Sequence, residues 1–346
     1  MKILSIVGAR PQFIKLAPLS ALLADQHEEI IVHTGQHYDY LMSEKIFKDL
    51  GIREPDYHLG AGSGSHASQT GNMMKGLEEV MLKTRPDKVI VFGDTNSTLA
   101  GALAAAKLNI HLVHIEAGLR SYNKSMPEEI NRVVTDHVSS DLFAPTKNAM
   151  QILEKEGLKE ISFLTGDIMV DTLANNLRIA EERSDILSEL KLVPGEYNLL
   201  TLHRGYNVDD PEKLFSILPQ LESLEEKILF PVHPRTNKIL ESSNYQPRNI
   251  ELINPVGYLD FILLEKNCKR IITDSGGIQK EAYILKKPCI TLRTETEWVE
   301  TVEEGWNLLL DPNEKYLADR INEFKVPKNI KEVFGQDVAV EMVKLI

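Results

Sequence analysis

The sequence predicts an α/β protein with two Rossmann-like domains, each built on a parallel sheet, with a cleft between them that holds the functional site. Short apolar runs alternate with stretches of helical periodicity, a pattern typical of parallel sheets covered by helices. The alternation runs in two series, separated at 166–197 by a charged helical connection that ends in Pro194-Gly195. A chain of 346 residues is long enough for about two domains, so each series is assigned to one of them.

The expected elements follow from this alternation. In the first series we expect strands at 2–7, 29–34, 88–92, 111–115, 141–144 and 161–164, with helices between them that include 12–24 and 96–107. In the second series we expect strands at 198–202, 228–232, 250–253, 270–273, 289–292 and 307–310. The tail, 329–346, ends in an apolar stretch of helical character.

Composition and charge exclude several classes of protein. A net charge of −12 argues against a general nucleic-acid binder. No apolar run is long enough to span a membrane, and the N-terminus has no signal core with a cleavage site, so we expect a cytoplasmic protein without membrane insertion. Cys268 and Cys289 form no CxxC pair, and we expect both thiols to be reduced and buried.

The first strand is followed by a pattern that suits an anion. Gly8 permits a tight turn and Pro11 fits the start of a helix. The amides of that helix start, together with Arg10 and Lys15, would bind a phosphate. No G-x-G-x-x-G follows the strand and no G-x-x-x-x-G-K-S/T occurs in the chain, which disfavours a bound dinucleotide and Walker-type ATP hydrolysis. We therefore expect no cofactor.

Three carboxylates follow successive elements of the first half. Asp94 ends the strand in VFGDTNST, Glu116 ends the strand in VHIEAGLR, and Glu128 opens the helix in MPEEINRVV. Asp94 could instead cap a helix, and acids in a first turn favour the helix dipole. Gathered and partly desolvated, however, the three could act as general acid and base. Arg132 lies one turn on and could pair with Glu128 or with Glu129.

The second half supplies cations and a second anion nest at strand ends. His203 follows one predicted strand and His233 follows the next. Ser275, Gly276 and Gly277 lead directly into a helix, so their amides would bind an anion. Glu281 lies four residues into that helix and could accept hydrogen bonds from a ribose diol.

Two other kinds of site are disfavoured. His111, His114 and Glu116 have an H-x2-H-x-E spacing, but the period of a strand puts His114 and Glu116 on one face and His111 on the other. A zinc site there is not expected, and we expect no metal elsewhere. Ser275 lacks the G-x-S-x-G of a serine hydrolase.

These motifs together resemble one known family. The segments GARPQFIK, GDTNSTLAGALAA, HIEAGLRS, MPEEINR, LTLHR, PVHPRT and DSGGIQKEA occur in the order found in the non-hydrolysing UDP-N-acetylglucosamine 2-epimerases. The resemblance runs from residue 1 to about 310. It implies a GT-B-like pair of domains, a homodimer, and a UDP-sugar substrate for surface polysaccharide synthesis. The first domain would comprise 1–166 with the C-terminal helix, 330–346, packed back on it, and 167–329 would bind UDP.

The resemblance also implies a role for each matching residue. Asp94, Glu116 and Glu128 would be the catalytic acids, and His203 would act beside the diphosphate. The remaining substrate-binding residues would be Arg10 and Lys15 at the phosphates, Ser275, Gly276 and Gly277 in the phosphate nest, Glu281 at the ribose, Phe261 near the uracil, and Arg132 and His233 close to the sugar or phosphates. Gln36 and His37 match a motif of the family's allosteric UDP-GlcNAc site.

Several positions depart from the commonest family pattern. Gln12 and Lys280 stand where acids are frequent, Tyr206 stands where HRxEN has glutamate, and TETEWVE at 294–300 lacks an arginine and a proline. GARPQFIK, HTGQHYD and TEWVE are more similar to the branch acting on UDP-2,3-diacetamido-2,3-dideoxyglucuronate. Both sugars therefore stay open, as do a GT-B glycosyltransferase and a UDP-sugar sensor.

Overall fold

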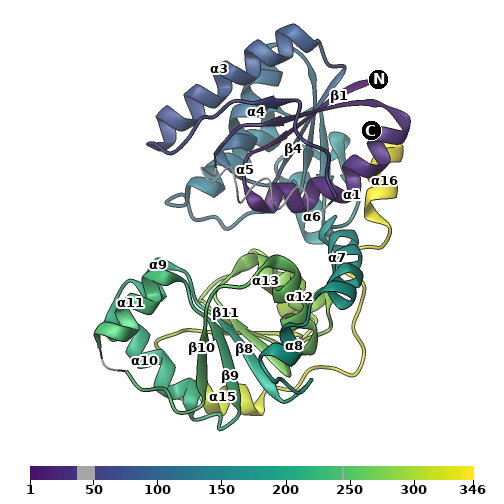
Figure 1. The fold of residues 1–346 in the computed structure, drawn as a ribbon. Coiled ribbons are helices and arrows are strands. Elements are labelled where there is room, and N and C mark those ends of the chain that lie inside the picture. Colours follow the sequence, from purple (N-terminus) through teal and green to yellow (C-terminus); the bar gives the residue numbers. More distant parts are fainter. Residues whose placement is uncertain (37–50, 244) are drawn as a thin grey trace. The chain divides into compact units, whose positions relative to one another are not determined.

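The computed structural model describes residues 1–36, 51–243 and 245–346 of the chain. It divides into two compact units (Figure 1), one comprising Met1–Thr172 with Glu332–Ile346 and the other comprising Leu173–Lys331. Each unit has its own parallel sheet covered by helices. The predicted α/β class with two parallel sheets is therefore confirmed.

The sheet of unit 1 has the order β3-β2-β1-β4-β5-β6-β7 within the described residues. Its strands are β1 (Lys2–Val7), β2 (Glu28–His33), β3 (Tyr57–His58), β4 (Lys88–Phe92), β5 (His111–Ile115), β6 (Asp141–Ala144) and β7 (Ser162–Leu164). Each neighbouring pair is parallel. The sequence predicted all of these strands except β3, which has only two residues and no apolar run.

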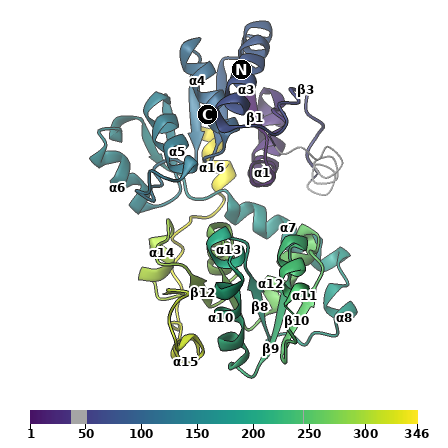
Figure 2. The ribbon, with the colours of Figure 1, turned by 90° about the vertical axis from the view of Figure 1, so that its left-hand side faces the viewer.

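Helices cover both faces of this sheet, as Figures 1 and 2 show. They are α1 (Arg10–Gln26), α3 (His66–Thr84), α4 (Asn96–Lys107), α5 (Pro127–Val138), α6 (Lys147–Lys155), the 3-10 turn η1 (Lys159–Ile161) and α16 (Val338–Leu345). Alternate residues of β1 serve the two faces, because side chains point to opposite sides along a strand. Ile3 and Val7 pack in the core with α1 and α16, whereas Leu4 and Ile6 pack with α3 and α4.

The C-terminal helix α16 packs in the core of unit 1, against α1. Val338 and Met342 are buried in the same cluster as Leu16. Asp171 Oδ2 accepts a 2.6 Å hydrogen bond from the amide of Ala339, at the start of the helix. The first and last segments of the chain therefore share one hydrophobic core.

The sheet of unit 2 has the order β10-β9-β8-β11-β12-β13 in the part of the chain that the structure describes. Its strands are β8 (Tyr197–Thr201), β9 (Lys227–Pro231), β10 (Ile250–Ile253), β11 (Arg270–Thr273), β12 (Cys289–Leu292) and β13 (Asn307–Leu310). The sequence predicted every one, two of them shifted by one residue. The helices are α7 (Met169–Arg183), which runs across the boundary of the units, α8 (Ile186–Glu189), α9 (Gly205–Val208), α10 (Pro211–Glu222), α11 (Pro234–Ser242), α12 (Tyr258–Asn267), α13 (Gly276–Ile284), α14 (Val299–Glu303) and α15 (Leu317–Glu323).

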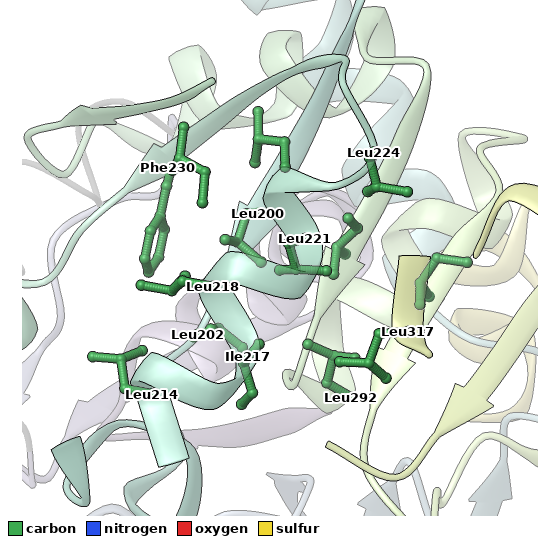
Figure 3. Packing of buried hydrophobic residues seen from close by; sticks show 14 of the residues in the cluster. Leu200, Leu202, Leu214, Ile217, Leu218, Leu221, Leu224, Phe230, Leu292 and Leu317 are labelled. Carbon is green, nitrogen blue, oxygen red and sulfur yellow. The ribbon is translucent and has the colours of Figure 1, made fainter. Parts of the chain in front are cut away.

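Figure 3 shows how α10 packs on this sheet. Leu214, Ile217, Leu218 and Leu221 follow the i, i+3, i+4, i+7 spacing of one helix face and are fully buried. They meet strand side chains such as Phe230. At about 1.5–3 kcal/mol for each fully buried side chain of this kind, this contact is a main source of stability for unit 2.

The described helices include none that is both long and apolar enough to cross a bilayer. Cys268 and Cys289 are free and buried, as predicted. Burial raises the pKa of the Cys289 thiol to about 12.

Candidate active site

The polar residues singled out in the first half follow neighbouring strands of unit 1. Strands β1, β4 and β5 lie side by side, and Lys15, Asp94 and Glu116 come after them in turn. Parallel strands end at the same sheet edge, where ligand sites of such sheets form. The fold therefore brings these three residues to one edge of the sheet.

Glu116 forms an ion pair with Lys15 of α1. Its Oε2 atom lies 2.5 Å from Lys15 Nζ, and the two side chains are 12% and 10% exposed. Glu116 has a left-handed backbone, with φ 71°, which is uncommon for a residue with a side chain. The expectation that Glu116 shares a strand face with His114 is therefore wrong, because β5 ends at Ile115 and Glu116 turns toward α1.

Asp94 is paired with Arg132 of α5. Arg132 donates to Asp94 Oδ2 from Nε at 2.9 Å and from Nη2 at 2.6 Å. Its Nη1 donates to Glu129 Oε2 at 3.0 Å, so Glu129 is one partner of Arg132 while the side chain of Glu128 is exposed. Thr95, rather than Asp94, caps α4.

Glu129 ties the loop before α5 to the helix. Burial raises the pKa of its carboxyl, but hydrogen bonds outweigh burial, and the net pKa lies below the ordinary value. The amides of Ser121 and Tyr122 donate to the carboxylate at 2.8 and 2.9 Å, and the charge of Arg132 adds to their effect. Of the two adjacent glutamates, Glu129 is structural, and Glu128 remains available to a ligand.

Gln12 closes the turn between β1 and α1. Its Oε1 accepts from the amides of Gly8 and Ala9 at 2.8 and 3.1 Å. Its Nε2 donates to the Phe92 carbonyl and to Thr98 Oγ1, both at 3.0 Å. An ionised glutamate could make the first pair of bonds but not the second. The amide thus links the first loop to the end of β4.

The other predicted residues of unit 1 lie at the same edge. Arg10 opens α1 and is exposed. Gln36 Oε1 accepts from the amide and the hydroxyl of Ser97 at 2.8 and 2.7 Å, so it bridges β2 and α4. His37, its neighbour in the predicted allosteric motif, lies outside the described residues.

Sequence reasoning named Glu129 and Arg132 of α5 as a possible pair but missed Asp136, which a helical reading would have found. Glu129, Arg132 and Asp136 are spaced by three and four residues, so they share one face of the helix. All three are buried. Charged residues repeated at this spacing indicate a shared helix face, and this pattern in the sequence predicts that Asp136 lies on the same face as Glu129 and Arg132.

In unit 2, Asp274 holds His203 in place. Asp274 Oδ1 lies 2.9 Å from His203 Nδ1, and the carboxylate also accepts from the amides of His203 and Arg204 at 3.0–3.2 Å. Asp274 is fully buried. Burial raises the pKa of Asp274, but His203 and the other donors lower it further, and the net value lies below the ordinary one. With Nδ1 turned inward, the half-exposed His203 ring can offer Nε2 to a ligand.

The predicted anion nest is the start of α13. Ser275 is its N-cap residue, and its hydroxyl makes no capping bond. A side chain at Gly276 would lie 2.3 Å from Glu297 Oε1, so Glu297 would have to move to admit one. Gly277 is exposed. The free amides at the start of a helix attract anions, and His203 follows the neighbouring strand β8.

Glu281 and Glu265 form a buried carboxyl pair across α13 and α12. Glu265 is fully buried and Glu281 nearly so. Burial first, and the neighbouring charge of Glu281 next, hold the pKa of Glu265 well above its ordinary value. Phe261, one turn before Glu265, is half-buried in the same helix, and His233 is exposed after β9.

Two of the departures from the family pattern contact each other. The Nζ atom of Lys280 lies 4.1 Å from the centre of the Trp298 ring, within the range of a cation–π interaction. Both side chains are buried. Lys280 and the tryptophan of TETEWVE therefore belong to one altered feature.

The described residues contain no group of three or more His, Cys, Asp or Glu side chains that could bind a metal ion.

Comparisons with known proteins cover nearly the whole chain. A family model described as UDP-N-acetylglucosamine 2-epimerase matches residues 20–345. A relative from Methanococcus maripaludis named UDP-N-acetylglucosamine 2-epimerase homolog is 54% identical, covering 94% of this chain and 92% of its own. A UDP-2,3-diacetamido-2,3-dideoxy-D-glucuronate 2-epimerase of Pseudomonas aeruginosa is 46% identical, covering 90% and 88%. The crystal structure of Methanocaldococcus jannaschii UDP-GlcNAc 2-epimerase with UDP-GlcNAc and UDP is similar at TM-score 0.89 and 44% identity, covering 100% and 99%.

Proposed function

The chain belongs to the UDP-N-acetylglucosamine 2-epimerase family, and on that premise we propose that it interconverts UDP-GlcNAc and UDP-ManNAc. It is an isomerase of a UDP-sugar. The observation that carries the proposal is the pair of buried or half-buried carboxylates, Asp94 and Glu116, that follow neighbouring strands and are each held by a cation.

The chemistry explains why acids and cations are both needed. The proton on C2 of an N-acetylhexosamine is not next to a carbonyl, so its direct removal is too difficult. If the C1–O bond breaks first, UDP takes the bonding electrons, positive charge develops at C1, and the C2 proton becomes acidic. Anti loss of that proton leaves 2-acetamidoglucal. Re-addition of UDP at C1, with a proton delivered to the opposite face of C2, inverts the centre.

Unit 1 would move the protons. In the proposal Asp94, Glu116 and Glu128 serve as acid and base, and Arg132 and Lys15 orient two of them. General acid–base catalysis of this kind contributes roughly 10²–10⁴-fold per group. The two ion pairs are short, which supports a preorganised arrangement of the carboxylates.

Unit 2 would hold the nucleotide. The hydroxyl of Ser275 and the amides of Gly276 and Gly277, with His203, would stabilise the departing diphosphate, where negative charge grows as the bond breaks. Glu281 would accept from the ribose hydroxyls and Phe261 would lie beside the uracil. Arg10 and His233 would add positive charge near the phosphates or the sugar. The support for these roles is the nest at the start of α13 and the fixed His203 ring.

One incubation tests the reaction. Purified protein is mixed with UDP-GlcNAc in D2O, and the products are separated by anion exchange and examined by NMR. The proposal expects deuterium at C2 and a UDP-ManNAc product. A GT-B glycosyltransferase would give no exchange without an acceptor, and a sensor would only bind. Absence of exchange at C2 with both UDP-GlcNAc and UDP-2,3-diacetamido-2,3-dideoxyglucuronate would contradict the proposal.

A second substrate is favoured by a specific observation. A relative named UDP-2,3-diacetamido-2,3-dideoxy-D-glucuronate 2-epimerase is 46% identical, and Trp298, which is buried against Lys280, lies in TEWVE, a segment that resembles that branch. The same incubation with the diacetamido uronate decides between the sugars by the ratio of kcat/KM. The C2 reaction itself is the same for both.

We also propose that the protein is a cytoplasmic homodimer and that its products enter surface polysaccharide synthesis. Light scattering of the purified protein measures the mass directly. A single-protomer mass across the working concentration range would contradict the dimer.

A further inference from the structure

A buried cluster of charged side chains lies beneath the two loops that carry Asp94 and Glu116. His114 on β5 and Asp136 on α5 are both fully buried. His114 Nδ1 lies 2.6 Å from Asp136 Oδ1, and its Nε2 donates to the carbonyl of Gly93 at 2.8 Å. The residue after Gly93 is Asp94.

The other oxygen of Asp136 reaches the second loop. Asp136 Oδ2 accepts from the amide of Gly118 at 3.1 Å and lies 2.7 Å from Nη2 of Arg120. Gly118 stands two residues after Glu116. Burial raises the pKa of Asp136, but its bonds to His114 and Arg120 outweigh burial and leave the pKa below the ordinary value. The cluster therefore joins β5, α5 and both loops through hydrogen bonds to main-chain atoms.

Stability alone gives no reason for such a cluster. Buried charges lose their hydration, and well-packed apolar residues in their place are often as stable. The cluster instead fixes the orientation of the main-chain groups to which it is hydrogen-bonded. One ring nitrogen of His114 lies at the Gly93 carbonyl and the other at the Asp136 carboxylate, so the ring is held from both sides.

The two loops have backbone conformations that depend on contacts with the surrounding structure. Gly93, Glu116 and Gly118 all have left-handed backbones, with φ of 63°, 71° and 82°. A side chain at Gly118 would lie 2.7 Å from the carbonyl of Ala149, so this loop is also tightly packed. Glycine adopts such a backbone readily, but Glu116 carries a side chain, and a residue of that kind keeps a left-handed backbone only where its surroundings fix it.

We propose that His114 and Asp136 are positioning residues for the reaction: they hold the main chain at Gly93 and Gly118, and thereby fix the carboxylates of Asp94 and Glu116 relative to each other. Neither side chain touches the substrate. The inference rests on the proposed epimerisation, because it assigns Asp94 and Glu116 to proton transfer. A displacement of about 1 Å in a catalytic group can reduce the rate about 10²-fold.

The same strand offers a matched control. His111 Nε2 lies 2.6 Å from Asp141 Oδ2, so β5 carries a second histidine–aspartate pair of the same length. No bond of that pair reaches Gly93 or Gly118 among the described contacts. The variants His114→Gln and Asp136→Asn are therefore compared with His111→Gln and Asp141→Asn.

Kinetics and hydrogen exchange are measured on the full-length variants. We expect His114→Gln and Asp136→Asn to lower kcat by about 10²-fold, while KM for the UDP-sugar stays within about threefold, since the nucleotide site in unit 2 is unchanged. Amide exchange should rise by a larger factor at 93–97 and 116–120 than in β1 and β4, where it reports only the lower stability of the unit as a whole. The control variants should keep kcat.

Each outcome decides the proposal. Exchange that rises by the same factor throughout unit 1 as at the two loops, together with the loss of kcat, would make the cluster merely structural and overturn the inference, and so would variants that do not fold. Unchanged kcat would overturn it as well. If the wild-type protein turns over neither sugar, the proposed function fails, and the exchange data alone show whether the loops are held by His114 and Asp136.

Discussion

At the scale of single residues, the environment of each carboxylate decides what it can do. Glu128 and Glu129 are adjacent in sequence, yet one is exposed and the other is buried under two amides and Arg132. The same side chain therefore serves a structural role at one position and is free to meet a ligand at the next.

The three proposed catalytic acids give the first prediction. Asp94→Asn, Glu116→Gln and Glu128→Gln keep the shape of each side chain but remove its ability to exchange a proton. We expect each to lower kcat by about 10²–10⁴-fold, measured by deuterium incorporation at C2. Glu154→Gln in α6, an exposed carboxylate, removes the same charge and should leave kcat unchanged. Near-full turnover in all three variants would refute the assignment.

Glu265 gives a prediction of alkaline sensitivity. The pKa of its buried carboxyl is raised, so its contribution to stability is complete below the unfolded value of about 4.3 and is lost as pH rises through the folded value. Glu265→Gln stays neutral at every pH. The melting temperature of this variant should therefore rise relative to that of the wild type as pH rises from 4 to 9.

The exposed Glu323 of α15 supplies the control for that experiment, as Glu323→Gln. Parallel melting curves for the wild type and Glu265→Gln across this pH range would show that the buried carboxyl pair does not carry the effect.

At the scale of elements, the docking of α16 depends on a glycine. Gly166 has φ 89°, and a side chain there would lie 2.6 Å from the carbonyl of Phe334 and 2.9 Å from Val338 Cγ2. Gly157 has a similar φ of 80°, but no atom of the described residues would lie within 4 Å of a Cβ placed there. A comparison of substitutions at Gly157 and Gly166 therefore separates the cost of backbone strain from the cost of a steric clash.

Gly166→Ala should therefore destabilise the protein more than Gly157→Ala. The left-handed backbone costs about 1–2 kcal/mol for any residue with a side chain, and only Gly166→Ala adds a clash with the segment that leads into α16. Denaturant unfolding measures the free energy of both variants. Equal losses would mean that the segment before α16 moves aside without cost.

Elements with a strong periodic signal were predictable and short or special ones were not. The apolar runs gave nearly every strand, because strands buried on both faces read as continuous hydrophobic segments. β3 is two half-exposed residues and has no such signal. Glu116 was placed on the wrong face because its left-handed backbone is set by the turn after β5, which the period of a strand cannot reveal.

The candidate site was predictable in its parts but not in its pairings. Motifs named Asp94 and Glu116, which follow strands, and Lys15 and Arg132, which lie in the second turns of α1 and α5. That Lys15 pairs with Glu116, and Arg132 with Asp94, depends on which strands are neighbours in the sheet. Contacts between residues distant in the chain are not encoded in local spacing.

At the scale of the whole molecule, acid should weaken both units. Asp136 in unit 1 and Asp274 in unit 2 have pKa values below the ordinary one. Their contributions are present above the unfolded value of about 3.9 and are lost as pH falls below it through the folded values. We expect the free energy of unfolding to drop steeply below about pH 4, measured by circular dichroism in denaturant at each pH.

Asp136→Asn and Asp274→Asn should be less stable than the wild type at pH 7 and show a shallower fall in acid. If the variants lose stability in acid as steeply as the wild type, other carboxylates control the acid response.

The path of the chain through its two units has a consequence for biosynthesis. Unit 2 is one continuous stretch, whereas the core of unit 1 is completed only by Val338 and Met342 near the end. On the ribosome, where folding proceeds domain by domain as the chain emerges, unit 1 must wait for Val338 and Met342, and unit 2 can finish before it. A stop codon between unit 2 and Val338 would thus damage unit 1, exposing the apolar side of α1 to chaperones and proteases.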